Sequence, residues 1–181
     1  MNTNSNLADV FVERSFQSPV RNSDDHLVLE ETVACLDLYN VRFVESFLSE
    51  NRHRMICHFV APDAESVRQA MRGAGLNADS IWAGNIHDEP SSNTGNVIVE
   101  TMRESSIDTR SQALTHDAVH RALRATGLRL SRTFTSLDQL RTVSLFAVPD
   151  RIAVESVVST LQQPSNAIWF CQHRTALRRS A

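Results

Sequence analysis

Two glutamates stand inside segments whose composition is otherwise typical of buried β-strands. Glu13 lies in the segment 10–16, and Glu100 lies in an equally strand-like segment further along the chain. Because side chains alternate between the two faces of a strand, the valines before Glu13 face one side and Glu13 faces the other. A buried carboxylate is costly unless it is paired or binds a ligand. Each glutamate is therefore a candidate catalytic base, and Glu13 is also a candidate metal ligand; the alternative is an ion pair with an arginine such as Arg14 or Arg42.

Histidine and cysteine side chains supply further candidate metal ligands. His116 and His120 are four residues apart in a predicted helix, so both imidazoles lie on one face and can share a metal; the alternative is a solvated helix surface. Cys57 is expected to share the face of Glu13 from the neighbouring strand and to act as a soft metal ligand. Its alternative role is that of a small buried apolar group. His58, also a candidate ligand, is expected to point the opposite way from Cys57 and to lie against a helix.

Two tryptophans, Trp82 and Trp169, occupy matching positions in predicted strands. Their simplest role is symmetric core packing, and the alternative is an aromatic wall that binds a cofactor or another ligand. Cys171 and His173 share a strand face with Trp169, because residues two apart on a strand point the same way. They form a second small group of potential metal ligands.

The chain matches itself after a shift of 87 positions without a gap. The matching pairs include Val10 and Val97, Glu13 and Glu100, Pro62 and Pro149, Asp63 and Asp150, and Trp82 and Trp169. A fixed offset over a whole unit is the signature of a tandem duplication. Positions at which the two copies differ are therefore good places to look for function.

Each copy predicts the element order β-α-β-β-α-β of the ferredoxin-like split βαβ unit. Asp63 is expected to cap the second helix of the first copy, and Asn40 to end the first helix in the left-handed conformation. The predicted strands of the first copy are 10–16, 41–49, 55–60 and 81–87, and those of the second copy are 97–103, 128–136, 142–147 and 168–174.

The predicted fold class is therefore α+β, with two ferredoxin-like repeats that form a pseudo-dimeric α+β barrel. Each sheet carries its helices on one face, and the bare faces must be covered. The expected segments are a flexible leader (1–9), repeat 1 (10–87), a turn-rich linker (88–96), repeat 2 (97–174) and a basic tail (175–181).

The composition and net charge of the chain exclude several classes of function. The chain has 181 residues and a formal net charge of −3, which indicates neither a nucleic-acid partner nor a membrane surface. No apolar run is long enough to span a membrane, and no secretory signal is visible. All 18 basic residues are arginine, so lysine Schiff-base chemistry is excluded. An odd number of cysteines, three, favours free thiols in the cytoplasm.

One stretch of the first repeat resembles a known family. It comprises Val12–Phe16, Cys57–Arg68 with its Cys-His-Phe-Val-Ala-Pro-Asp-Ala-Glu run, Gly73–Leu76 and Ile81-Trp82. It is similar to the small bacterial nickel-binding, ferredoxin-like proteins, a family otherwise of unknown function. The resemblance implies a ferredoxin-like fold, association through the sheets and binding of a divalent metal such as nickel. Members commonly carry a histidine in the second helix, where this chain reads Arg-Gln-Ala-Met-Arg.

Three hypotheses for function follow. The first is a small metal-binding protein, with nickel or another divalent transition metal as ligand. The second is an enzyme or binder for a small organic molecule in the cavity between the sheets, with Glu13 or Glu100 as the base. The third is a scaffold that binds partner proteins or forms homo-oligomers through exposed sheet edges.

Overall fold

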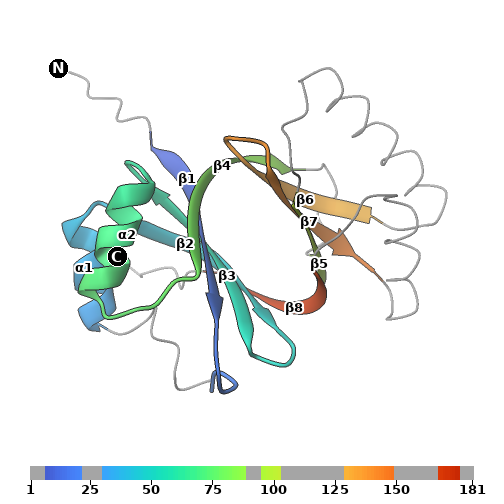
Figure 1. Ribbon diagram of the computed structural model, residues 1–181, viewed down its shortest axis with the longest axis horizontal. Coiled ribbons are helices and arrows are strands. Elements are labelled where there is room, and N and C mark those ends of the chain that lie inside the picture. The colour runs from blue at the N-terminus through green and yellow to red at the C-terminus, as the bar shows by residue number, and fades with distance from the viewer. Residues whose placement is uncertain (1–6, 22–29, 89–94, 103–128, 149–166, 176–181) are drawn as a thin grey trace. The chain divides into compact units, whose positions relative to one another are not determined.

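In the part of the chain that the structure describes, antiparallel strands make up most of the regular structure of this α+β protein (Figure 1). The computed structural model describes residues 7–21, 30–88, 95–102, 129–148 and 167–175. The elements are β1 (Ala8–Ser15), α1 (Glu30–Leu38), β2 (Arg42–Ser49), β3 (Arg54–Ala61), α2 (Ala64–Gly73), β4 (Ser80–Asp88), β5 (Val97–Met102), β6 (Arg129–Ser136), β7 (Arg141–Ala147) and β8 (Ala167–Thr175). Within these ranges, neither helix has the length and apolar character that crossing a membrane requires.

The chain divides into two compact units. Unit 1 comprises residues 1–84 and 172–181, and unit 2 comprises residues 85–171. In unit 1 the antiparallel strand order is β4–β1–β3–β2. In unit 2 the order is β8–β5–β7–β6. All eight strands coincide with the predicted strands to within two residues at either end.

Local sequence signals fix the ends of the two helices in unit 1. Asp63 caps α2, because its carboxylate accepts a hydrogen bond of 2.7 Å from the backbone N–H of Ser66. This bond lowers the pKa of Asp63 below its ordinary value. Asn40 follows α1 with a φ of 54°, and Gly75 follows α2 with a φ of 66°. The predicted cap and the predicted left-handed helix end at Asn40 are both confirmed.

One face of the unit 1 sheet, here called the helix face, packs against α1 and α2 (Figure 1). Val10 and Val12 of β1 lie in this core, as predicted, together with Cys57 of β3. All three are fully buried. The same core contains Leu36 of α1, and Val67, Ala70 and Met71 of α2.

The register of β1 and β3 corrects two predictions about the faces of β3. Cys57 stands opposite Val12, while Glu13 stands opposite Ile56. Directly opposed residues point to the same side of a sheet, so Cys57 lies on the helix face and not beside Glu13. His58 stands opposite Phe11 and therefore shares the face of Glu13. Cys57 and His58 therefore lie on the faces opposite to those predicted.

A β-bulge interrupts the pairing of β2 with β3. The register shifts between Phe43, which stands opposite Phe59, and Glu45, which stands opposite His58. The extra residue turns Glu45 to the side of the sheet that faces away from the helices. Without this bulge, Glu45 would stand opposite Cys57 and point into the helix-face core.

Unit 2 has a smaller described core. Val97, Val99, Leu130, Phe146 and Val148 are buried together. The predicted helices of the second repeat, and with them the candidate ligands His116 and His120, lie outside the described residues.

Candidate functional site

The face of the unit 1 sheet that lies opposite the helices, here called the opposite face, carries an unusual number of polar groups. Glu13, Glu45 and His58 all lie on it, and each is at most 8% exposed. Buried ionisable groups need partners, so their contacts indicate what this face does. The strands position them: β1 supplies Glu13, β3 supplies His58, and the bulge in β2 delivers Glu45.

Four side chains form a continuous line of contacts, here called the carboxylate–imidazole chain. His173 Nε2 lies 2.6 Å from Glu45 Oε2. The other oxygen of Glu45, Oε1, lies 3.4 Å from His58 Nδ1, and His58 Nε2 lies 2.8 Å from Asp9 Oδ1. The side chains of His58 and Glu45 in the middle are each 5% exposed, whereas the terminal Asp9 and His173 reach solvent.

Hydrogen counting shows that the carboxylate–imidazole chain has room for an additional proton. Both ring nitrogens of His58 face carboxylate oxygens, and an ionised carboxylate only accepts hydrogen bonds. Both contacts are hydrogen bonds only when the imidazole carries two hydrogens or one carboxyl group is protonated. A neutral imidazole between two carboxylates leaves negative charge that attracts a cation.

Aromatic rings flank this polar chain. The ring of Phe11 stacks on His58, with centroids 5.0 Å apart, and on Trp82, with centroids 4.5 Å apart. Phe47 stacks on His173 at 4.9 Å with the ring planes 11° apart. These stacks hold both imidazole rings in fixed orientations.

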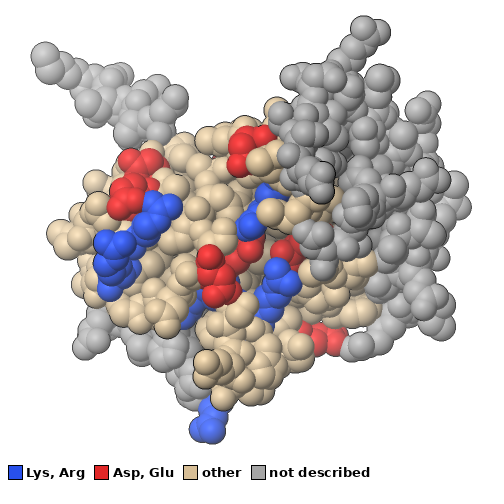
Figure 2. Space-filling view, viewed as in Figure 1, with Lys and Arg blue, Asp and Glu red and all other residues tan. Residues whose placement is uncertain are grey.

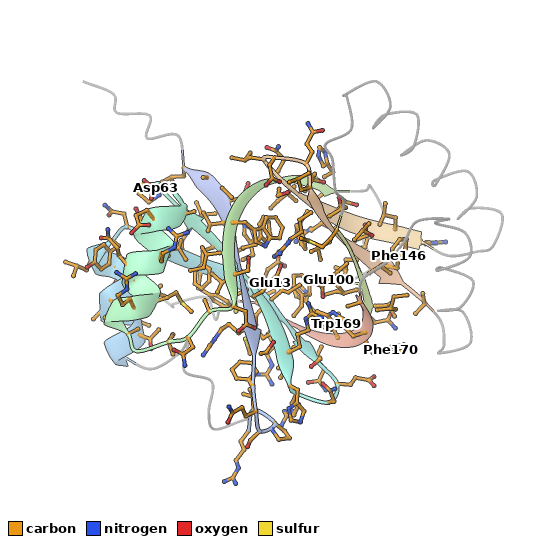
Figure 3. All side chains as sticks on the ribbon, in the orientation of Figure 1. Glu13, Asp63, Glu100, Phe146, Trp169 and Phe170 are labelled. Carbon is orange, nitrogen blue, oxygen red and sulfur yellow. The ribbon has the colours of Figure 1, made fainter. Side chains whose placement is uncertain are left out.

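Glu13 belongs to a separate hydrogen-bonded pair on the same face. The indole N–H of Trp82 donates to Glu13 Oε1 at 3.0 Å. Unit 2 contains the matching pair, in which Trp169 donates to Glu100 Oε1 at 2.6 Å. Figure 3 labels Glu13, Glu100 and Trp169. The two candidate bases and the two candidate ligand-binding tryptophans are thus partners within each unit.

The carboxylate–imidazole chain has no counterpart 87 positions away, unlike the glutamate–tryptophan pair. The register of β5 with β7 matches that of β1 with β3, so the positions can be compared directly. Asp9, Glu45, His58 and His173 correspond to Asn96, Arg132, Leu145 and Ile86. A feature present in both units suits a structural role, whereas a polar group confined to unit 1 suits a specific function.

The predicted metal ligands do not form a ready-made metal site. Among the residues that the structure describes, no three His, Cys, Asp or Glu side chains are placed to hold a metal ion together. Cys57 is in the helix-face core, and Glu13 is hydrogen-bonded to Trp82. The donors of the carboxylate–imidazole chain suit a divalent transition metal by type. As they stand, however, the imidazole nitrogens point at carboxylate oxygens and do not converge on one point.

Sequence reasoning found two members of the carboxylate–imidazole chain, His58 and His173, and missed Asp9 and Glu45. The signal for both was available in the comparison of the repeats. Asp9 becomes Asn96 and Glu45 becomes Arg132, so each changes its charge between the copies. The face of Glu45 depends on the bulge, which alternation alone does not reveal.

Comparison with protein families gives one match. Residues 11–83 match the family described as nickel responsive protein, SCO4226-like. The matched segment includes Glu45 and His58 and ends before unit 2. No curated protein matches the chain.

The solved structures to which the chain is similar include two that cover almost all of it. A putative chlorite dismutase, TA0507, shares 14% identity with a TM-score of 0.51, over 93% of this chain and 95% of that chain. Chlorite dismutase from Candidatus Nitrospira defluvii, in complex with imidazole, shares 12% identity with a TM-score of 0.54, over 96% of this chain and 92% of that chain. SCO4226 from Streptomyces coelicolor A3(2) shares 22% identity with a TM-score of 0.37, over 48% of this chain and 100% of that chain. The first two matches show a chlorite dismutase-like α+β fold.

Proposed function

We propose that this protein reversibly binds a divalent transition metal, with nickel as the leading candidate, through the carboxylate–imidazole chain of unit 1. The observation that carries the proposal is a buried carboxylate, Glu45, in contact with two imidazoles, His58 and His173. Imidazole and carboxylate groups together are typical ligands of nickel and zinc.

Charge supports a cationic ligand at this place. Asp9, Glu13 and Glu45 bring three carboxylates to the opposite face of one sheet. Two of them are at most 8% exposed, and a buried carboxylate is stabilised by a cation. The family match supports nickel in particular, because the matched family is described as nickel responsive.

Binding at this site needs rearrangement of the donors. The Glu45 carboxylate now accepts from His173 at 2.6 Å, and that contact has to open before both groups can bind one ion. The metal therefore competes with internal hydrogen bonds, which lowers affinity and suits a reversible sensor or buffer better than a permanent structural site.

Calorimetric titration of the metal-free protein with Ni²⁺ and Zn²⁺ tests the proposal. We expect binding tighter than about 1 mM, which corresponds to roughly −4 kcal/mol. His58→Ala and His173→Ala should each weaken binding at least about tenfold. The matched control is His87→Ala, which removes an exposed imidazole of β4 that lies outside the carboxylate–imidazole chain.

A second pair of variants separates this site from the one predicted on the second repeat. If His116→Ala with His120→Ala removes nickel binding while His58→Ala does not, the metal binds at the helical pair and the proposed location is wrong. If no variant changes a weak, millimolar interaction, nickel binding itself is refuted.

A second candidate function is binding of a small organic molecule, with Glu13 as a base. The stacked rings of Phe11 and Trp82 favour it, because flat aromatic surfaces suit planar ligands. Glu100 and Trp169 would have the same role in unit 2. Glu13→Gln should then abolish turnover or binding of that ligand, while it weakens nickel binding far less than His58→Ala does.

We also infer that the chain arose by tandem duplication of one ferredoxin-like unit. The shared strand order, the glutamate–tryptophan pairs and a second bulge support this inference. That bulge lies between Leu130 and Arg132, 87 positions after the bulge between Phe43 and Glu45. A positive φ at Arg52 and at Gln139 follows the same offset.

A further inference from the structure

A cavity of about 510 Å³ lies on the helix side of unit 1, away from the carboxylate–imidazole chain. The last turns of α2 and the segment that connects α2 to β4 form its walls. Its volume falls in the range of small-molecule sites. Neither the family match nor the proposed metal function assigns a role to it.

The residues that line this cavity include two arginines and several apolar side chains. Arg68 and Arg72 are one turn apart on α2, and Met71, Leu76 and Ile81 supply the apolar surface. Figure 2 shows basic residues over the region where Figure 1 draws α2. Arg68 contacts Glu65, whose pKa is lowered mainly by that hydrogen bond. Arg72 stands in the last turn of the helix, next to the cavity.

The segment 76–79, which lines the cavity, is held by hydrogen bonds at both of its ends. Leu76 N donates to Met71 O at 2.9 Å, and Asp79 N donates to Glu13 O at 2.8 Å. Between them, the guanidinium of Arg14, 7% exposed, donates from Nε to the carbonyl oxygen of Asn77 at 2.9 Å. A wall fixed in this way is already formed before a ligand arrives, which reduces the entropic cost of binding.

We infer that this cavity binds a small organic monocarboxylate with an apolar body. The guanidinium of Arg72 attracts the negative charge, because that of Arg68 is already paired with Glu65. The apolar side chains contact the hydrocarbon part of the molecule. Asp79 also lines the cavity, and its carboxylate repels a dianion more strongly than a monoanion. A dianion such as a phosphate monoester is therefore disfavoured relative to a carboxylate.

Titration of the metal-free full-length protein with phenylacetate, followed by amide NMR shifts, tests the inference. We expect a Kd below about 1 mM, with the largest shifts in the segment 75–79. Acetate lacks the apolar body and phenylacetamide lacks the charge, so each should bind at least about tenfold more weakly. Arg72→Gln should weaken phenylacetate binding about tenfold, and the matched control Arg129→Gln, on an exposed residue of β6, should not.

Three results would overturn the inference. The first is an absence of shifts in the segment 75–79 at saturating phenylacetate. The second is equal binding of phenylacetate and phenylacetamide, and the third is binding of phenyl phosphate at least as tight as that of phenylacetate. Nickel affinity should be the same in Arg72→Gln and in the unmodified protein, which separates this site from the proposed metal site.

Discussion

Replacing His173 with phenylalanine isolates one contact of the carboxylate–imidazole chain. His173→Phe keeps a flat ring that can still stack on Phe47, where the planes are now 11° apart at 4.9 Å. It removes the nitrogen that lies 2.6 Å from Glu45 Oε2. Any loss of stability therefore reports the hydrogen bond and not the packing of the ring.

The expected loss of stability in His173→Phe depends on how deeply the hydrogen bond is buried. A hydrogen bond to a charged group contributes about 1.5–3 kcal/mol. The His173 side chain is 22% exposed, so water can reach the carboxylate from that side after the change. We therefore expect a loss near the lower end of this range, about 1.5–2 kcal/mol. His173→Ala should cost about 0.5–1.5 kcal/mol more, because the aromatic stack with Phe47 is lost as well.

The assay is equilibrium unfolding in guanidinium chloride with a chelator present, followed by tryptophan fluorescence. Glu45→Gln and the double variant complete a double-mutant cycle with His173→Phe. A coupling energy of about 1–2 kcal/mol is expected for groups in direct contact. His87→Ala serves as the surface control and should change stability by less than about 0.5 kcal/mol.

A coupling energy indistinguishable from zero, with both single variants destabilised, would refute the reasoning. It would mean that Glu45 and His173 stabilise the protein independently, so that the contact itself contributes nothing. The proposed metal site would then lose its central pair of ligands.

Three further predictions concern hydrogen bonds outside the carboxylate–imidazole chain. Asp63→Ala should reduce the helicity of α2 at neutral pH. The hydrogen bond from Ser66 holds the pKa of Asp63 below its ordinary value of 3.8, so the contribution of the cap is complete above pH 3.8 and is lost as pH falls through the lowered pKa. The difference between variant and parent in far-UV circular dichroism should therefore disappear in strong acid. Trp169→Phe should cost about 1.5–3 kcal/mol in chemical unfolding, because it removes a 2.6 Å hydrogen bond to the buried Glu100; an unchanged midpoint would contradict that role. Ser136→Ala should cost about 1 kcal/mol by the same measurement, because its hydroxyl accepts a hairpin hydrogen bond at 3.0 Å.

The elements were predictable from the sequence because their signals are local. Alternation of apolar residues located the strands, and short capping signals located helix ends, as at Asp63 and Asn40. The repeat added independent support, since a strand seen in one copy could be checked against the other. Register between strands is not local, and for that reason the faces predicted for Cys57 and His58 were wrong.

The candidate site was less predictable because its members come from four strands. Asp9 is in β1, Glu45 in β2, His58 in β3 and His173 in β8. Nothing in the neighbourhood of any one of them in the sequence indicates that the other three are near. The glutamates and tryptophans were easier to single out, because both copies contain them, but their pairing was not predicted.

Because of the bulge in β2, the effect of deleting one residue from this strand depends on which residue is deleted. Deleting Val44 would remove the surplus residue and join the two registers into an unbroken ladder, with Glu45 still opposite His58. Deleting Ser46 would shorten the strand by the same amount, but it would bring Glu45 opposite Cys57 and carry a carboxylate into the hydrocarbon interior. Evolution along this strand should therefore tolerate a deletion at Val44 and reject one two residues later, although the two shortened proteins would have the same length.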